Sequence, residues 1–133
     1  MQVNVQWTGD ENFVATTQHG HKVEMSAEAK QAPTPMELVL AAVAGCSSVD
    51  VVSILKKSRC EVSHCGVEVE AQRAEQIPRV FTHICLNYRV CGKNITRRAA
   101  ERAVSLSMEK YCSVSHMLAG RVTITYRVEI EED

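Results

Sequence analysis

Three short segments near the start of the chain alternate apolar and polar residues, which is typical of strands with one buried face. They cover residues 2–8, 12–17 and 21–25. In the first segment Val3, Val5 and Trp7 share one face, and Gly9-Asp10 then indicates a turn. The pattern predicts an antiparallel three-stranded meander at the start of the domain.

A long helix is predicted after this meander. Thr34 is a candidate N-cap, Pro35 suits the first helical position, and Glu37 completes a Thr-x-x-Glu capping box. We expect the helix to reach about Lys57. Its segment 38–49 contains no charged residue and is apolar all round, so it requires cover on every side. One small domain rarely supplies that cover, and a second subunit is its expected source.

The second half of the chain predicts two strands, a broken helix and a last strand. Their ranges are 67–71 and 80–90 for the strands, 96–118 for the helix and 121–130 for the last strand. The helix is expected to break near residues 111–113, with Ser113 capping a short final turn. In the strand 80–90 one face carries Leu86 and Tyr88, and the other carries Cys85. The order βββ-α-ββ-α-β defines a single mixed α+β domain over residues 1–133.

Charge and length restrict the function. The chain has 133 residues, with 15 basic against 16 acidic side chains, which argues against nucleic acid and against an anionic membrane surface as partners. The sequence opens on a strand pattern, without the features of an export signal. The apolar run 38–49 would cover roughly 18 Å as a helix, too short for a bilayer. We expect a soluble, cytoplasmic protein.

Six cysteines in such a chain are expected to be reduced thiols. Cys46 lies in the uncharged helix and Cys112 lies at the helix break, and together they would form a reversible dithiol couple. A packing role is the alternative for each. Cys85 and Cys91 are expected to be structural, as are Cys60 and Cys65. A zinc site is a weaker alternative, because no Cys-x-x-Cys or paired His spacing is present. Its ligands would be Cys60, His64 and Cys65, with His83 and Cys85 nearby.

Two motifs carry a resemblance to a known family. They are Pro35-Met36-Glu37-Leu38 with Ala44-Gly45-Cys46, and Cys112-Ser113-Val114-Ser115. They resemble the Pro-Glu-Glu-Leu…Ala-Gly-Cys and Cys-Pro-Val-Ser motifs of the OsmC/Ohr family, the osmotically induced and organic-hydroperoxide-resistance proteins. The segments 48–52 and 109–112 look most like the YhfA-type subgroup. The resemblance implies an OsmC-like fold, an intertwined homodimer and two central buried helices. We expect no cofactor and no metal.

The resemblance also implies a peroxidase activity in oxidative stress. Cys46 would attack a hydroperoxide, Cys112 would resolve the sulfenic acid, and a dithiol reductant, such as a lipoylated protein, would restore the thiols. Active family members use an Arg–Glu pair to activate the first cysteine. Here Met36 occupies the glutamate position and Glu37 follows one residue late, while residues 1–33 contain no arginine.

We therefore expect a slow hydroperoxide reductase with Cys46, Cys112 and Glu37 as its site. A redox-sensing or binding protein of the same fold, without peroxidase activity, is the alternative. Retained cysteines fit both functions equally well.

Overall fold

The computed structural model describes residues 1–133, and the chain forms two compact units, Met1–Ala41 and Ala42–Asp133. Each unit is described by itself. The prediction of one domain over the whole chain stays a prediction.

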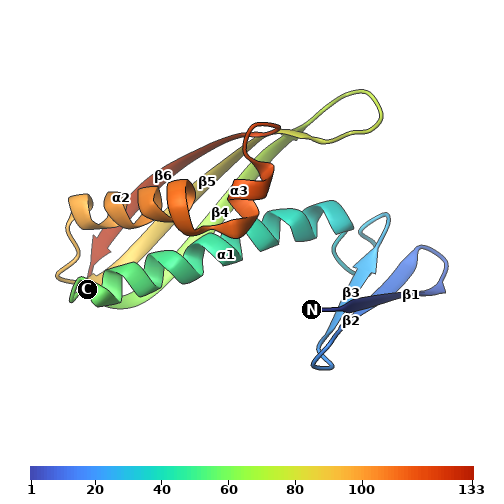
Figure 1. Cartoon of the computed structure of the whole chain (residues 1–133), viewed down its shortest axis with the longest axis horizontal. Coiled ribbons are helices and arrows are strands. Elements are labelled where there is room, and N and C mark those ends of the chain that lie inside the picture. Colours follow the sequence, from blue (N-terminus) through green and yellow to red (C-terminus); the bar gives the residue numbers. More distant parts are fainter. The chain divides into compact units, whose positions relative to one another are not determined.

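The first unit contains an antiparallel sheet with the order β1-β2-β3 (Figure 1). Its strands are β1 (Val3–Gly9), β2 (Asn12–Thr17) and β3 (Lys22–Ser26). The predicted meander is confirmed to within a residue or two. Val3, Val5 and Trp7 share one face of β1 as expected, and within this chain all three are exposed.

Helix α1 (Pro35–Lys57) begins where the capping signals predict. The Glu37 N–H donates to Thr34 Oγ1 at 3.1 Å, and the Thr34 N–H donates to Glu37 Oε1 at 2.9 Å. This is the reciprocal pair of a capping box.

The apolar segment 38–49 was predicted to be too short to cross a membrane, but the apolar helix in the structure is longer than this segment. Helix α1 has 23 residues, and by length and composition it is long and apolar enough to cross a bilayer. The reason is that the apolar pattern resumes after Asp50 with Val51, Val52 and Leu55. Length and composition are weak evidence, because a core helix of a soluble protein passes the same test.

The second unit is built on a three-stranded mixed sheet. Its strands are β4 (Glu61–Arg73), β5 (Phe81–Lys93) and β6 (Thr123–Glu132). Strands β4 and β5 are antiparallel, and β6 runs parallel to β5. The helices cover one face of this sheet (Figure 1). Beneath them Leu86 and Tyr88 of β5 are at most 1% exposed, as the alternation of that strand predicts.

The range predicted for the fourth strand, 67–71, was much too short. Strand β4 starts at Glu61 and has an irregular register between Val62 and His64, which interrupts the simple alternation. Several of its residues, among them His64 and Glu68, are exposed, so hydrophobicity alone marks only its centre.

The broken helix is confirmed, with one correction. It consists of α2 (Arg97–Leu106), a π-helical turn η1 (Ser107–Tyr111) and α3 (Ser113–Leu118). The N-cap of α3 is Cys112 rather than Ser113. Cys112 has the extended backbone of a cap residue, and its sulfur accepts the Ser115 N–H at 3.4 Å, so a thiol occupies the place of the usual hydroxyl.

Candidate functional site

The fold brings together the two cysteines that the sequence singles out. Cys46 lies half-buried in the middle of α1, and Cys112 lies between η1 and α3 with 1% of its surface exposed. Burial raises the pKa of the Cys112 thiol, and interaction with the neighbouring Cys46 raises it further. Both cysteines are free thiols. The two sulfur atoms therefore belong to one site.

Cys112 is held by hydrogen bonds on both sides. Its N–H donates to the Ser107 carbonyl at 2.7 Å, across the π-helical turn. On the other side the Ser115 hydroxyl donates to the Cys112 carbonyl at 3.1 Å. Hydrogen bonds from Ser115 lower the pKa of Cys112, but burial outweighs them. Cys112 is therefore a protonated thiol at neutral pH.

A buried polar network surrounds the thiol pair. The hydroxyls of Ser47 and Tyr88 lie 2.5 Å apart, which links α1 to β5. The Ser107 hydroxyl lies 3.2 Å from the Ser47 carbonyl and 2.9 Å from Asp50 Oδ2, which links the start of η1 to α1. Burial raises the pKa of Tyr88 to about 12, so its phenol keeps its proton.

Sequence reasoning missed this network. The signal that could have found it is a polar side chain among apolar ones. Ser47 lies in a largely apolar helix, and Tyr88 takes an inward position between aliphatic residues of the same strand face. Buried hydroxyls of this kind require partners.

Glu37, the third predicted site residue, belongs to the first unit. Its carboxylate accepts the Thr34 N–H in the capping box, and the residue is exposed. One of its oxygens therefore has a structural use. Its role toward Cys46 stays a prediction.

The other four cysteines lie in four different surroundings. Cys60 is buried and donates to the Asn94 carbonyl at 3.2 Å, Cys65 lies beside Ser48, Cys85 donates to Asn87 Oδ1 at 3.8 Å, and Cys91 donates to Glu131 Oε2 at 3.9 Å. Burial raises the pKa of Cys65. The structure contains no group of three or more His, Cys, Asp or Glu side chains arranged to hold a metal ion. The weaker zinc alternative therefore has no geometric support.

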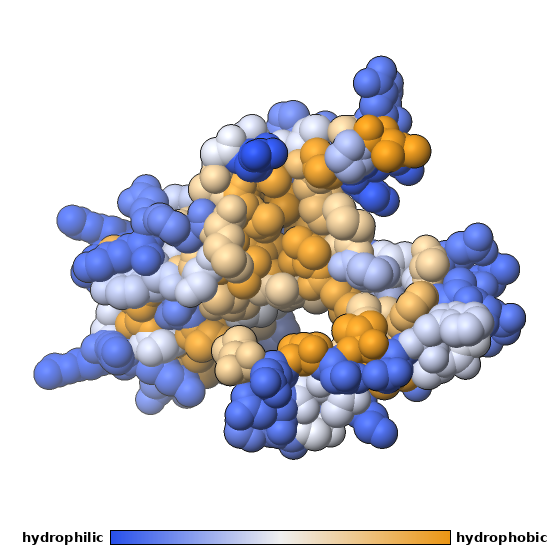
Figure 2. Space-filling model, turned by 45° about the vertical axis from the view of Figure 1, so that its right-hand side comes forward, coloured by the Kyte–Doolittle hydropathy of each residue, from blue (hydrophilic) through white to orange (hydrophobic).

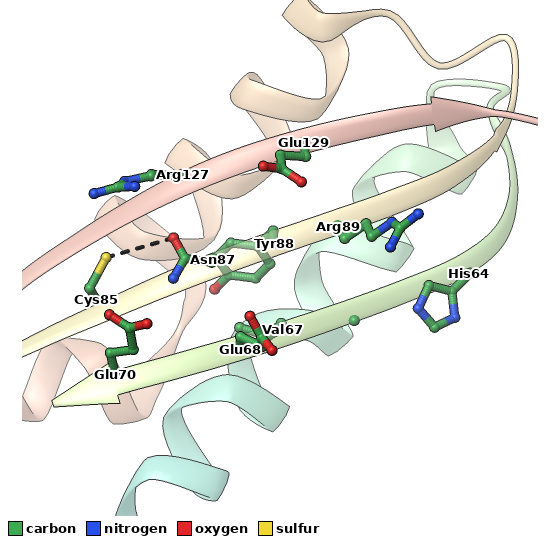
Figure 3. A pocket seen from close by; sticks show the side chains of 11 residues that line it. His64, Val67, Glu68, Glu70, Cys85, Asn87, Tyr88, Arg89, Arg127 and Glu129 are labelled. Atoms are coloured by element: carbon green, nitrogen blue, oxygen red, sulfur yellow. Dashed lines mark hydrogen bonds between the residues drawn. The ribbon is translucent and has the colours of Figure 1, made fainter.

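A polar hollow of about 580 Å³ lies on the face of the sheet opposite the helices (Figure 3). Glu68 comes from β4, Arg89 from β5, and Arg127 with Glu129 from β6. Arg89 is paired with Glu131, and charges of both signs line the hollow. Cys85 lines the hollow, but Cys46 and Cys112 do not. Because most of its side chains alternate with the inward ones, the hollow has the character of a solvated face.

The geometry defines a class of protein: an α+β fold in which a long apolar helix and a helix break hold two free cysteines side by side. The chain belongs to the OsmC-like protein family, whose model matches residues 27–127. Protein YhfA of Escherichia coli K12 is 45% identical over 131 residues, covering 98% of both chains. The resemblance to the family and its YhfA-type subgroup is thus confirmed.

Solved structures confirm the α+β OsmC-like fold, which is a soluble fold. A hypothetical protein from Aquifex aeolicus VF5 matches with a TM-score of 0.91 and 32% identity, covering 99% of this chain and 96% of the other. The organic hydroperoxide resistance protein OhrB of Bacillus subtilis matches with a TM-score of 0.64 and 20% identity, covering 97% and 98%. At that identity the second match shows the fold alone.

Proposed function

We propose that this protein reduces organic or small hydroperoxides slowly through a dithiol–disulfide cycle of Cys46 and Cys112, with an external dithiol as reductant. The observation that supports the proposal is that Ser107 hydrogen-bonds both thiol segments: its carbonyl accepts the Cys112 N–H, and its hydroxyl donates toward the carbonyl of Ser47, the residue after Cys46. Membership of a family whose structural relatives include organic hydroperoxide resistance proteins supports it.

The two cysteines differ in a way that suits different roles. Cys46 is half-buried, so a peroxide can reach its sulfur, whereas Cys112 is 1% exposed and keeps its proton. In the proposed first step the Cys46 thiolate attacks a peroxide oxygen. The S–O bond forms, the O–O bond breaks, and the leaving alkoxide takes up a proton to become an alcohol.

In the second step the Cys112 sulfur attacks the sulfur of the Cys46 sulfenic acid. The S–S bond forms, the S–O bond breaks, and the hydroxide leaves as water with the proton of Cys112. A dithiol such as a lipoylated protein then reduces the disulfide by exchange and is itself oxidised.

Activation of Cys46 limits the proposed reaction. Glu37 would polarise the peroxide with the carboxylate oxygen that the helix cap does not use. No arginine precedes α1, and Lys30 is already paired with Glu28 at 3.3 Å, so Lys22 or a cation of a second subunit would have to assist. Replacing Glu37→Gln keeps an oxygen for the cap and removes the charge. We expect it to lower turnover without loosening the helix start.

A homodimer is part of the proposal, since proteins of this family are typically dimeric. Within this chain Val49 of α1 is 70% exposed, and it lines an apolar groove together with Val52. Figure 2 shows hydrophobic residues exposed at the surface of the chain. A second copy would remove this apolar surface from water. We further propose a cytoplasmic location, which is supported by the six free cysteines of the chain.

The second candidate function is a redox sensor or binding protein of the same fold without peroxidase activity. The commitment of Glu37 to the helix cap favours it, because that residue is the available substitute for the glutamate of the family's Arg–Glu pair. A sensor needs the thiol pair but not rapid turnover.

Consumption of cumene hydroperoxide in the presence of a dithiol separates the two functions. We expect Cys46→Ser to abolish it, and Cys112→Ser to allow one oxidation per chain and then stop, with Cys46 trapped as sulfenic acid. Cys85→Ser, on the opposite face of the sheet, is the matched control and should behave as wild type. Equal rates for wild type and Cys46→Ser would exclude the enzyme and leave the sensor.

A further inference from the structure

One buried serine connects the two segments that carry the thiols. Ser107 is 0% exposed and stands where α2 passes into η1. Its backbone N–H donates to the carbonyls of Ala103 and Val104 at the end of α2. Its own carbonyl accepts the Cys112 N–H at 2.7 Å. The backbone position of Cys112 therefore depends directly on Ser107.

The side chain of Ser107 reaches the other thiol segment. Its hydroxyl lies 2.9 Å from Asp50 Oδ2 and 3.2 Å from the Ser47 carbonyl. Ser47 follows Cys46 in sequence, and Asp50 lies one helical turn further on. The hydroxyl has one hydrogen to donate, and the carboxylate is the stronger acceptor.

The same turn of α1 is also fixed from the sheet side. The Ser47 hydroxyl donates to the Ala44 carbonyl at 3.1 Å and lies 2.5 Å from the Tyr88 hydroxyl. Tyr88 is 1% exposed and keeps its phenol proton, so it can serve as the donor in that pair. The turn that carries Cys46 thus has little freedom to move relative to β5.

We propose that Ser107 is a positioning residue for the dithiol pair: by bonding the Cys46 turn of α1 through its hydroxyl and Cys112 through its carbonyl, it fixes the separation of the two sulfurs. The inference rests on the proposed function for its reaction, the attack of Cys112 on an oxidised Cys46. A π-helical turn at this point supports it, since such turns are frequent at functional sites. Fixed proximity raises the rate of ring closure and stabilises the disulfide once formed.

Two measurements on Ser107→Ala test this role. After one equivalent of cumene hydroperoxide, we expect the Cys46–Cys112 disulfide to form at least tenfold more slowly, with sulfenic acid formation at Cys46 unchanged. In dithiothreitol redox buffers, with the disulfide identified by mass spectrometry, we expect a tenfold loss of disulfide stability, equivalent to about 30 mV for a two-electron couple. Ser105→Ala, two residues earlier in α2, is the matched control and should leave both values unchanged.

If Ser107 serves folding alone, Ser107→Ala will lower the melting temperature but change neither the rate of disulfide formation nor the stability of the disulfide. That result would overturn the proposal. If Ser107→Ala does not fold, a pair of variants at Asp50 replaces it. Both variants remove the charge of Asp50, but Asp50→Asn keeps an oxygen that can accept the Ser107 hydroxyl hydrogen, whereas Asp50→Ala does not. The redox potential should therefore shift further in Asp50→Ala than in Asp50→Asn. Equal potentials for the two variants would contradict the proposal.

The redox buffer contains no peroxide, which separates this inference from the proposed function. If wild type consumes no hydroperoxide but Ser107→Ala still destabilises the disulfide, the positioning role is supported and the peroxidase fails. If wild type forms no Cys46–Cys112 disulfide in the buffer, the positioning role itself is excluded.

Discussion

Replacing Ser47 by alanine should destabilise the protein more than replacing Tyr88 by phenylalanine, although both changes remove the same hydrogen bond. After Tyr88→Phe, the Ser47 hydroxyl still has the Ala44 carbonyl as an acceptor at 3.1 Å. After Ser47→Ala, the Tyr88 hydroxyl loses its hydrogen-bond partner in a position that is 1% exposed. We therefore expect a loss of about 1 kcal/mol for Tyr88→Phe and about 2–3 kcal/mol for Ser47→Ala.

Equilibrium unfolding in urea, at fixed protein concentration and under reducing conditions, measures both values. With a slope of roughly 2 kcal/mol per molar urea, Tyr88→Phe should lower the midpoint by about 0.5 M and Ser47→Ala by about 1–1.5 M. The double variant isolates the pair, and its coupling energy should be about 1 kcal/mol. Tyr126→Phe, at a position 36% exposed, is the control and should change stability by less than about 0.5 kcal/mol. An equal or smaller loss for Ser47→Ala would refute the ordering, because it would mean that the phenol does not depend on Ser47.

Three further predictions concern pH, assembly and backbone approach. Because burial raises the pKa of Tyr88 to about 12, the unfolded chain loses the phenol proton near pH 10 while the native chain keeps it. The free energy of unfolding should therefore fall as the pH rises from 10 to 12. Chemical unfolding at stepped alkaline pH should show a smaller fall for Tyr88→Phe. Val49→Lys should convert the proposed homodimer to monomer in sedimentation at low micromolar concentration, whereas a dimer that persists would contradict an interface on this face of α1. A Cβ at Gly92 would lie 1.9 Å from the Glu61 carbonyl oxygen, so Gly92→Ala should lose the native circular dichroism spectrum. A Cβ at Gly45 meets nothing within 4 Å in this chain, so Gly45→Ala is the control and should keep that spectrum.

The sequence predicted well the elements whose signals are local. The capping box of Thr34 and Glu37 needs only four consecutive residues, and the structure contains both of its hydrogen bonds. Strand β5 alternates without interruption through Leu86 and Tyr88, so its buried face could be predicted. These features depend on neighbours in sequence, which is the information that a single chain carries.

Features that depend on irregular backbone were predicted less well. The irregular register near His64 hides the first part of β4 from a period-two pattern. At the helix break, Ser113 is a better N-cap residue than cysteine by composition. The π-helical turn instead places Cys112 at the cap, because its N–H reaches back to the Ser107 carbonyl. N-cap propensity predicted Ser113, but the geometry of the preceding π-helical turn makes Cys112 the N-cap.

The polar network around the thiols could not be predicted, because its partners are far apart in sequence. Ser47 is separated by 41 residues from Tyr88 and by 60 residues from Ser107. Each hydroxyl taken alone resembles an ordinary polar residue in an apolar segment. Only the fold shows that three buried hydroxyls and Asp50 satisfy one another around Cys46. A buried hydroxyl without a hydrogen-bond partner costs about 1–3 kcal/mol. The hydrogen bonds of this network offset that cost for all three hydroxyls. Their hydrogen bonds tie α1, β5 and η1 together next to Cys46 and close to Cys112, and the positioning role proposed for Ser107 follows from these links.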